Sequence, residues 1–141
     1  MLILFRRAVF AWLIADGDMH MKNLALLKIA EAGAGQFREV RMAPVYDAVT
    51  TRFFPRLEND RMALKLNGKD NNLRKSDFRK LAATAGMKAG DADEILADMS
   101  ARLAQGVDQL RLPELSGYHA DSAGMKDRML DIVRARLESV A

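Results

Sequence analysis

The pattern of hydrophobic and polar positions begins with a helix and continues into a short β region. Residues 2–15 carry apolar side chains at intervals of three and four residues, which is typical of one helix face: Phe5, Val9, Trp12 and Leu13. Apolar side chains on the other faces of this segment are Leu4, Phe10 and Ile14. We therefore expect a helix that is buried nearly all round and is broken by Gly17.

A β-hairpin is predicted after this helix and the polar stretch that follows it. Residues 24–29 form a short aliphatic run bounded by polar residues, and residues 36–42 are expected to return as the second strand. The Gly-Ala-Gly sequence at residues 33–35 supplies the turn, and Phe37 is expected to be the main apolar anchor of the second strand. Residues 50–60 are predicted to be a loop.

One more short strand is predicted before the chain becomes helical. Met62, Leu64 and Leu66 alternate with other residues, which indicates a half-buried strand. The dipeptide Asn67-Gly68 is a common turn sequence and is expected to close this strand. From here to the end of the chain the apolar residues recur at helical spacing, so the predicted fold class is mainly α with a small β-hairpin.

Capping residues suggest where the later helices begin and end. Ser76 is expected to be the N-cap of a helix that continues to Ala85 and is ended by Gly86. Asp91 and Glu94 resemble a capping box that opens the next helix. The apolar residues on one side of that helix are Ile95, Leu96, Met99, Leu103, Val107 and Leu110. The capping residues and the apolar residues on one side together predict a long amphipathic helix.

The last predicted helix is Ser122–Val140, after a connection marked by Pro113 and Gly117. No repeat, low-complexity segment or domain boundary is visible, so residues 1–141 are expected to form one domain. A hydrophobic content of 50% and a charged content of 29% are typical of a globular protein. The 22 basic and 19 acidic residues give a net charge of +3, which does not favour direct nucleic-acid binding.

Cysteine usage and the first apolar run limit the remaining classes. The chain has no cysteine, which excludes disulfides, thiol nucleophiles and cysteine-ligated zinc. Arg6 and Arg7 followed by apolar residues resemble the start of a secretory signal. That run ends at Asp16 and is too short to span a bilayer, so we interpret it as a core helix. We expect a cytoplasmic protein with no membrane partner.

The candidate chemistry is concentrated in residues 16–23, Asp-Gly-Asp-Met-His-Met-Lys-Asn. Carboxylates beside a carboxamide suit a hard cation such as Mg²⁺. Asp18 and Asn23 have the spacing D-x-x-x-x-N, which in a kinase catalytic loop places a substrate-orienting carboxylate and a metal-binding carboxamide on one turn. Taken alone, the pattern also fits an ordinary polar loop, because Asp and Asn commonly cap helices and form turns.

The spacing of the residues argues against two other kinds of metal site. An EF-hand that began at Asp16 would have Leu27 at its twelfth position, where the bidentate glutamate is required. The histidines His20 and His119 lie far apart and form no H-E-x-x-H motif, which argues against a zinc hydrolase.

Two motifs together resemble the C-terminal kinase region of HipA-like proteins, the toxins of bacterial toxin–antitoxin pairs. The first is D-x-H-x-K-N at residues 18–23, directly after the apolar helix, and the second is A-P-x-Y-D at residues 43–47, after the predicted hairpin. Residues 62–68, Met-Ala-Leu-Lys-Leu-Asn-Gly, also resemble the family's segment that follows the acid. The resemblance covers about residues 5–68.

This resemblance implies the C-lobe of a protein-kinase-like fold and Mg²⁺-dependent transfer of a phosphoryl group from ATP to a Ser/Thr hydroxyl of a protein. Asp18 would be the catalytic base, and Asn23 and Asp47 would bind Mg²⁺. Lys22 would contact phosphate, although a solvated lysine is an equal alternative. His20 is expected to brace the loop.

Alternative readings of two acids stay open. Asp47 could instead cap a helix that begins at Ala48. Asp16 departs from the small or amide residue expected at its position, and it is left unassigned because an extra carboxylate could either bind a second ion or repel Asp18.

The chain contains neither G-x-G-x-x-G nor G-x-x-x-x-G-K-[ST], although a kinase needs a loop over the phosphates. We therefore expect that the small lobe is absent and that the chain is a fragment or a stand-alone large lobe. Expected partners are a protein substrate and either a HipB-like antitoxin or a separate small-lobe chain. The alternatives are a non-catalytic interaction module for such a partner and a small-molecule phosphotransferase of the aminoglycoside-kinase type, which shares D-x-x-x-x-N.

Overall fold

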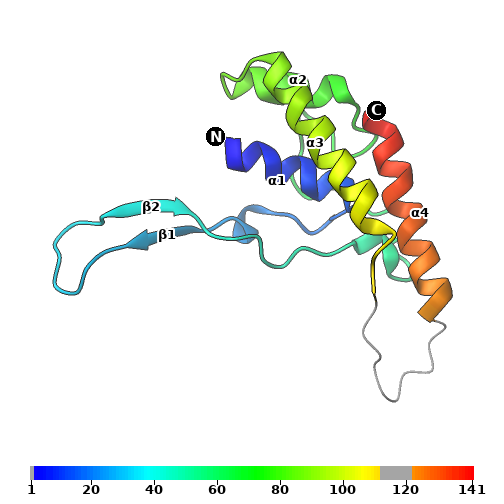
Figure 1. The fold of residues 1–141 in the computed structure, drawn as a ribbon, viewed down its shortest axis with the longest axis horizontal. Helices are drawn as coiled ribbons and strands as arrows, with labels where there is room; N and C mark the ends of the chain where they lie inside the picture. The colour runs from blue at the N-terminus through cyan, green and yellow to red at the C-terminus, as the bar shows by residue number, and fades with distance from the viewer. Residues whose placement is uncertain (1, 112–121) are drawn as a thin grey trace.

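The computed structural model describes residues 2–111 and 122–141, and it has a helical body from which a two-stranded arm extends (Figure 1). In chain order the elements are α1 (Leu2–Leu13), η1 (Met21–Asn23), β1 (Leu26–Ile29), β2 (Glu39–Met42), η2 (Thr51–Phe53), α2 (Lys75–Thr84), α3 (Ala89–Val107) and α4 (Ser122–Val140). The two labelled η are single 3₁₀ turns. The expectation of a mainly helical chain with a small β-hairpin is confirmed.

Helix α1 lies at the centre of the body and contacts α2, α3 and α4. Its side chains Phe5, Val9 and Trp12 are almost fully buried, and the Phe5 ring packs edge-on against Phe78 of α2, with the ring centroids 6.4 Å apart. The prediction that α1 is buried nearly all round is wrong at its first turn, where three apolar side chains are exposed: Leu2, Ile3 and Leu4. The other helices cover mainly the later turns, from Phe5 onward.

Strands β1 and β2 pair antiparallel, with Leu26 opposite Met42 and Ile29 opposite Glu39. Both strands are shorter than predicted, and they contact mainly each other rather than the helices. Phe37 lies outside β2 and is 57% exposed, with the Lys28 ammonium 5.2 Å from its ring centroid. The prediction of Phe37 as an apolar anchor is therefore wrong, because the arm extends away from the core that an anchor would need (Figure 1).

The strand predicted at residues 62–66 does not form. Met62 and Leu66 are buried as the alternation predicted, but the segment is irregular apart from an isolated bridge between Leu66 and Lys69. Asn67 and Gly68 form the predicted turn with positive φ angles of 51° and 83°. Side-chain alternation here reflects a segment that covers the core, and in the described residues no partner strand lies beside it.

Two predicted N-caps are wrong. Ser76 lies inside α2, whose N-cap is Arg74, and the Asp77 carboxylate accepts the Arg74 backbone N–H at 2.9 Å. Helix α3 begins at Ala89, so Asp91 lies in its first turn rather than at a capping box. The first error arises because residues 74–77 are all polar and could each reach the free N–H groups of the first turn, and only the folded geometry selects one. Helix α3 has its N-cap three residues earlier than expected, at Lys88, and no side chain caps it.

The glycine predicted to follow the second helix is confirmed. Gly86, with a φ of 69°, follows α2 as expected. Leu110 lies beyond the end of α3, so it is not part of that helix. Helix α4 has the predicted bounds, whereas the predicted connection at Pro113 and Gly117 lies outside the described residues.

Helix α4 is held against α1 by contacts to one tryptophan. The Trp12 indole N–H donates to the Ser139 hydroxyl at 3.0 Å, and the Arg136 guanidinium lies 3.5 Å from the ring centroid. Burial lowers the pKa of Arg136 to about 10, and the nearby charge of Arg52 acts in the same direction. In the residues described, no helix has both the length and the apolar character needed to cross a membrane.

Candidate functional site

The polar loop after α1 folds back onto the end of that helix. Ala15 adopts a left-handed conformation with a φ of 54°, and the Gly17 N–H donates to the Thr51 hydroxyl oxygen at 3.0 Å. The same hydroxyl donates to the Ala15 carbonyl at 3.3 Å. A Cβ at position 17 would collide with the side chains of Asp60 and Thr51. Glycine is therefore needed here for close approach rather than to end the helix, which already stops at Leu13.

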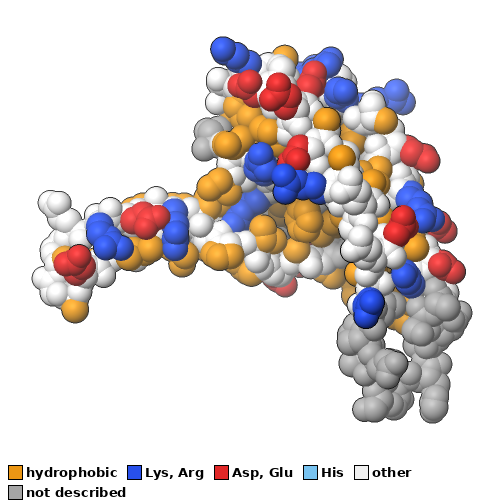
Figure 2. Space-filling model, in the orientation of Figure 1, with side chains coloured by type: hydrophobic (Ala, Val, Ile, Leu, Met, Phe, Trp, Pro, Cys, Tyr) orange, Lys and Arg blue, Asp and Glu red, His pale blue; other side chains and the backbone are white. Residues whose placement is uncertain are grey.

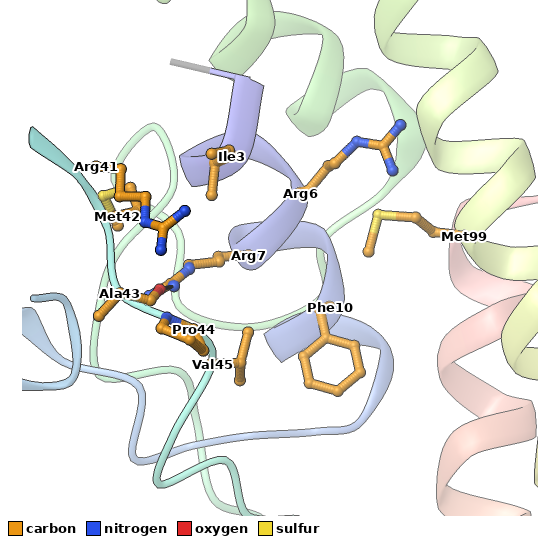
Figure 3. Close-up of a pocket in the computed structure, with 10 residues that line it drawn as sticks. All are labelled: Ile3, Arg6, Arg7, Phe10, Arg41, Met42, Ala43, Pro44, Val45 and Met99. Carbon is orange, nitrogen blue, oxygen red and sulfur yellow. Dashed lines mark hydrogen bonds between the residues drawn. The ribbon is translucent and has the colours of Figure 1, made fainter. Parts of the chain in front are cut away.

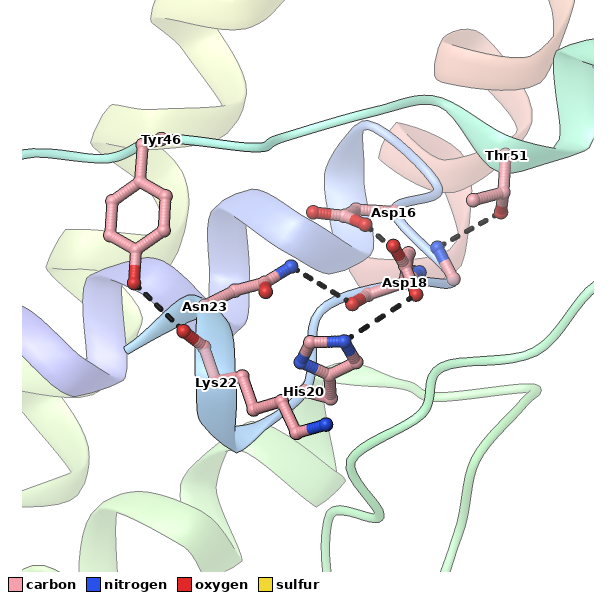
Figure 4. Close-up of polar contacts among 8 residues, drawn as sticks. Asp16, Asp18, His20, Lys22, Asn23, Tyr46 and Thr51 are labelled. Carbon is pink, nitrogen blue, oxygen red and sulfur yellow. Dashed lines mark hydrogen bonds and ion pairs between the residues drawn. The ribbon is translucent and has the colours of Figure 1, made fainter. Parts of the chain in front are cut away.

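Asp16 is a buried carboxylate beneath this loop and is only 4% exposed. Its Oδ1 accepts the backbone N–H of Asp18 at 3.0 Å (Figure 4). Burial raises the pKa of Asp16 above its usual value, and repulsion from the Asp18 carboxylate adds to this. Backbone donors, first among them the Asp18 N–H, oppose the rise in pKa. Asp16 thus fixes the backbone of the residue that carries the candidate catalytic acid.

The Asp18 side chain is exposed to solvent, in contrast to Asp16. Its Oδ1 lies 3.9 Å from Nε2 of the half-buried His20, and both are drawn in Figure 4. Nδ1 of His20 is buried and has no hydrogen-bond partner. His20 therefore borders Asp18, whose carboxylate remains open to an approaching hydroxyl group.

Asn23 ends the single turn η1 and is buried. Its side-chain N–H donates to the Asp18 carbonyl at 3.1 Å (Figure 4). The amide oxygen, at the other end of the carboxamide, takes no part in this hydrogen bond. Asn23, Asp16 and Asp47 all line one small cavity of about 20 Å³. That volume holds a particle about the size of a water molecule.

Asp47 reaches this cavity from the segment that follows β2. It has a left-handed φ of 53°, and no helix begins at Ala48, because the next element is η2 at Thr51. The alternative that Asp47 caps such a helix is therefore wrong. The Tyr46 hydroxyl donates to the Lys22 carbonyl at 2.8 Å, which joins the second motif directly to the first (Figure 4). The Lys22 side chain itself is exposed.

Sequence reasoning missed two positioning residues, Tyr46 and Thr51. Tyr46 belongs to the A-P-x-Y-D motif but had no role, and Thr51 lies in a segment predicted only as a loop. Both act through hydrogen bonds to distant backbone atoms, so no local pattern indicates them. The tyrosine position of the A-P-x-Y-D motif was the one signal in the sequence for Tyr46.

The oxygen atoms at the cavity suit a hard cation. Within residues 2–111 and 122–141, no three His, Cys, Asp or Glu side chains are grouped closely enough to hold a metal ion. Mg²⁺ does not need such a group, because it usually keeps several waters and binds through one or two carboxylates plus substrate phosphates. The amide oxygen of Asn23 and the carboxylate of Asp47 match that requirement.

A comparison with protein-family models matches residues 1–107 to the HipA-like C-terminal domain. The chain belongs to this family. The match includes the loop of residues 16–23, the hairpin and the whole of α3, so the candidate site of this HipA-like C-terminal domain lies within it. No curated protein matches the chain.

Proposed function

We propose that this HipA-like C-terminal domain is the large, catalytic lobe of a Ser/Thr protein kinase that transfers the γ-phosphoryl group of ATP with Mg²⁺. One observation carries the proposal. Asn23 and Asp47, which flank the hairpin in the sequence, line the same small cavity, next to the loop on which Asp18 is exposed. Membership of the family supports the same reading.

The proposed roles follow from the chemistry of phosphoryl transfer, which depends mainly on positioning and charge neutralisation. Asn23 and Asp47 would hold Mg²⁺, which would neutralise negative charge on the phosphates. Asp18 orients the Ser/Thr hydroxyl and accepts its proton. Lys22 contacts a phosphate oxygen through its exposed ammonium group. Asp16 takes no direct part and holds the Asp18 backbone in place.

The proposed kinase uses groups beyond this domain to hold the nucleotide. We propose that a small lobe, in the same protein or in a separate chain, supplies the adenine site and the loop over the phosphates. In a toxin–antitoxin context the partners are a protein substrate and a HipB-like antitoxin.

The metal site can be tested without any activity measurement. Mg²⁺ or Mn²⁺ should raise the melting temperature of the protein by mass action, with a gain of about 1.4 kcal/mol at tenfold the dissociation constant. Asp47→Ala should abolish this gain because it removes the anionic ligand. The matched control is Asp131→Ala, which removes an exposed carboxylate on α4. Equal stabilisation of wild type and Asp47→Ala would reject the site.

The proposed base is tested in the complete protein, with its small lobe present. Asp18→Asn keeps the side-chain shape but removes the anionic acceptor, so transfer of radiolabelled phosphate to a Ser/Thr substrate should fall by ~10²–10⁴-fold. If the variant is as active as wild type, Asp18 is not the base. If both are inert while Mg²⁺ still binds, a non-catalytic interaction module is the better description.

A further inference from the structure

A second and much larger cavity, of about 630 Å³, lies between α1, α3 and the segment that follows β2 (Figure 3). Its walls are mainly apolar and include Ile3 and Phe10 of α1, Met99 of α3 and Val45. Arg7, Phe10 and Val45 also border the small cavity described above. The larger cavity is therefore adjacent to the proposed metal site and shares these three side chains with it.

The charged side chains of this cavity are all basic. Arg6, Arg7 and Arg41 line it, and no Asp or Glu does. Arg7 is only 7% exposed, and its guanidinium donates to the Ala43 carbonyl while its Nε is buried without a partner. A buried charge is costly unless an opposite charge pairs with it.

In the part of the chain that the structure describes, no carboxylate forms an ion pair with Arg6 or Arg7. Arg41 has only a contact to Glu39, with 3.5 Å between Nε and Oε1, and both of these side chains are well exposed. Arg6 and Arg41 are thus cationic groups for which the described residues supply little counter-charge, whereas Arg7 also borders the small cavity that Asp16 and Asp47 line. An anionic group bound here would supply it.

Apolar side chains continue from the cavity onto the surface around it. Ile3 and Val45 are each at least half exposed, and so are Leu26 and Val40 on the hairpin. Figure 2 shows hydrophobic side chains around a hollow between the arm and the helical body, with basic side chains at its edge. A two-stranded hairpin is at best marginally stable in water by itself. Exposed apolar side chains that extend beyond the cavity onto the hairpin favour a polypeptide partner over a small molecule.

We propose that this cavity and the adjoining hairpin dock a polypeptide segment of a partner protein that presents carboxylates among aliphatic side chains. The aliphatic side chains would cover Ile3, Phe10 and Val45, and the carboxylates would pair with Arg6 and Arg41. Charge complementarity selects this occupant over a basic or neutral segment. The inference does not depend on phosphoryl transfer, so the two proposals fail separately.

A phage-displayed random-peptide library, selected against the full chain, tests the chemistry of the occupant. The selected peptides should be enriched in Asp and Glu beside Leu, Ile or Val. The dissociation constant of a fluorescently labelled selected peptide is then measured by polarisation. The double variant Arg6→Gln/Arg41→Gln should weaken binding by about tenfold, which corresponds to about 1.4 kcal/mol. Added salt should also weaken binding to the wild type.

The matched control is Lys65→Gln/Arg111→Gln, which removes two exposed cations outside the cavity and should bind as wild type does. Ile3→Ser tests the aliphatic contact and should weaken the same peptide. Circular dichroism checks that each variant keeps its helices. Selection of basic or uncharged peptides, selection of none, or equal binding to the Arg6→Gln/Arg41→Gln variant would overturn the proposal.

Discussion

At the scale of single residues, the site places two carboxylates of different character next to each other. Asp18 is open to solvent, whereas Asp16 is buried. The Asp16 carboxylate accepts the backbone N–H of Asp18 and so holds that part of the backbone in place. Burial raises the pKa of Asp16, so the folded state binds a proton there more readily than the unfolded chain does. The buried charge is thus a source of instability at neutral pH that the loop geometry tolerates.

This asymmetry makes the stability of the protein depend on pH in a defined direction. The usual pKa of an aspartate carboxyl group is 3.8, and that of Asp16 in the folded protein is higher. As pH rises through this interval, the folded state must ionise a buried group and therefore loses stability. Asp16→Asn keeps an acceptor for the Asp18 N–H without the charge. It should therefore melt at a higher temperature than wild type near pH 7, and the difference should vanish at acid pH.

Thermal unfolding of both proteins across this pH range measures the effect. Asp131→Asn serves as the control, because that exposed carboxyl lies on α4, away from the loop. A lower melting temperature for Asp16→Asn at neutral pH would mean that the folded protein stabilises the ionised carboxylate.

The sequence predicts part of this site. The motifs located Asp18, Asn23 and Asp47, and the structure brings Asn23 and Asp47 to one cavity. The metal and catalytic assignments themselves stay predictions. Tyr46 and Thr51 could not be found in this way, because their partners, the carbonyls of Lys22 and Ala15, become neighbours only after folding.

At the scale of elements, the start of α2 depends on one buried carboxylate. Asp77 accepts hydrogen bonds from the Lys69 ammonium at 2.8 Å and from the Arg74 N–H at 2.9 Å. Although burial opposes ionisation, these donors hold the pKa of Asp77 below its usual value. The carboxylate thus caps α2 and ties it to the turn that contains Lys69.

This arrangement predicts a sharp contrast between two adjacent substitutions. Asp77→Ala leaves the Arg74 N–H and the Lys69 ammonium without their partner and should lower the free energy of unfolding by ~1–3 kcal/mol. Ser76→Ala changes an exposed residue inside the helix and should stay within about 0.5 kcal/mol of wild type. Urea unfolding of the two variants checks this, and a larger effect of Ser76→Ala would restore Ser76 as the cap.

Helical periodicity was the dependable signal for elements. It located α1 and gave the bounds of α4, because burial on one helix face imposes a spacing that no other structure shares. The alternation at residues 62–66 was misleading, because an irregular segment that covers a core also buries every second side chain. Strand formation additionally needs a neighbouring strand, and only tertiary structure supplies one.

At the scale of the whole molecule, the described residues form a helical body with two hydrophobic clusters and an arm that contributes to neither. The larger cluster includes side chains from α1, α2, α3 and α4, and the smaller one consists of Val107, Leu130 and Val133. Neither includes a side chain from β1 or β2. The partner segment proposed above would therefore cover an arm that contributes nothing to either cluster. Its binding would add to the stability of the arm more than to that of the body.

The separation between arm and core has a consequence for local unfolding. Because β1 and β2 contact mainly each other, the hairpin can open without disrupting the helices, and opening costs far less than global unfolding. Hydrogen exchange should accordingly divide the backbone amides into two classes, with fast exchange in Leu26–Ile29 and Glu39–Met42 and slow exchange in α1. Strand β2 leads through Ala43 to Asp47, so each opening would also loosen one side of the proposed metal site. Equal protection of the arm and α1 would show instead that the molecule opens as one cooperative unit.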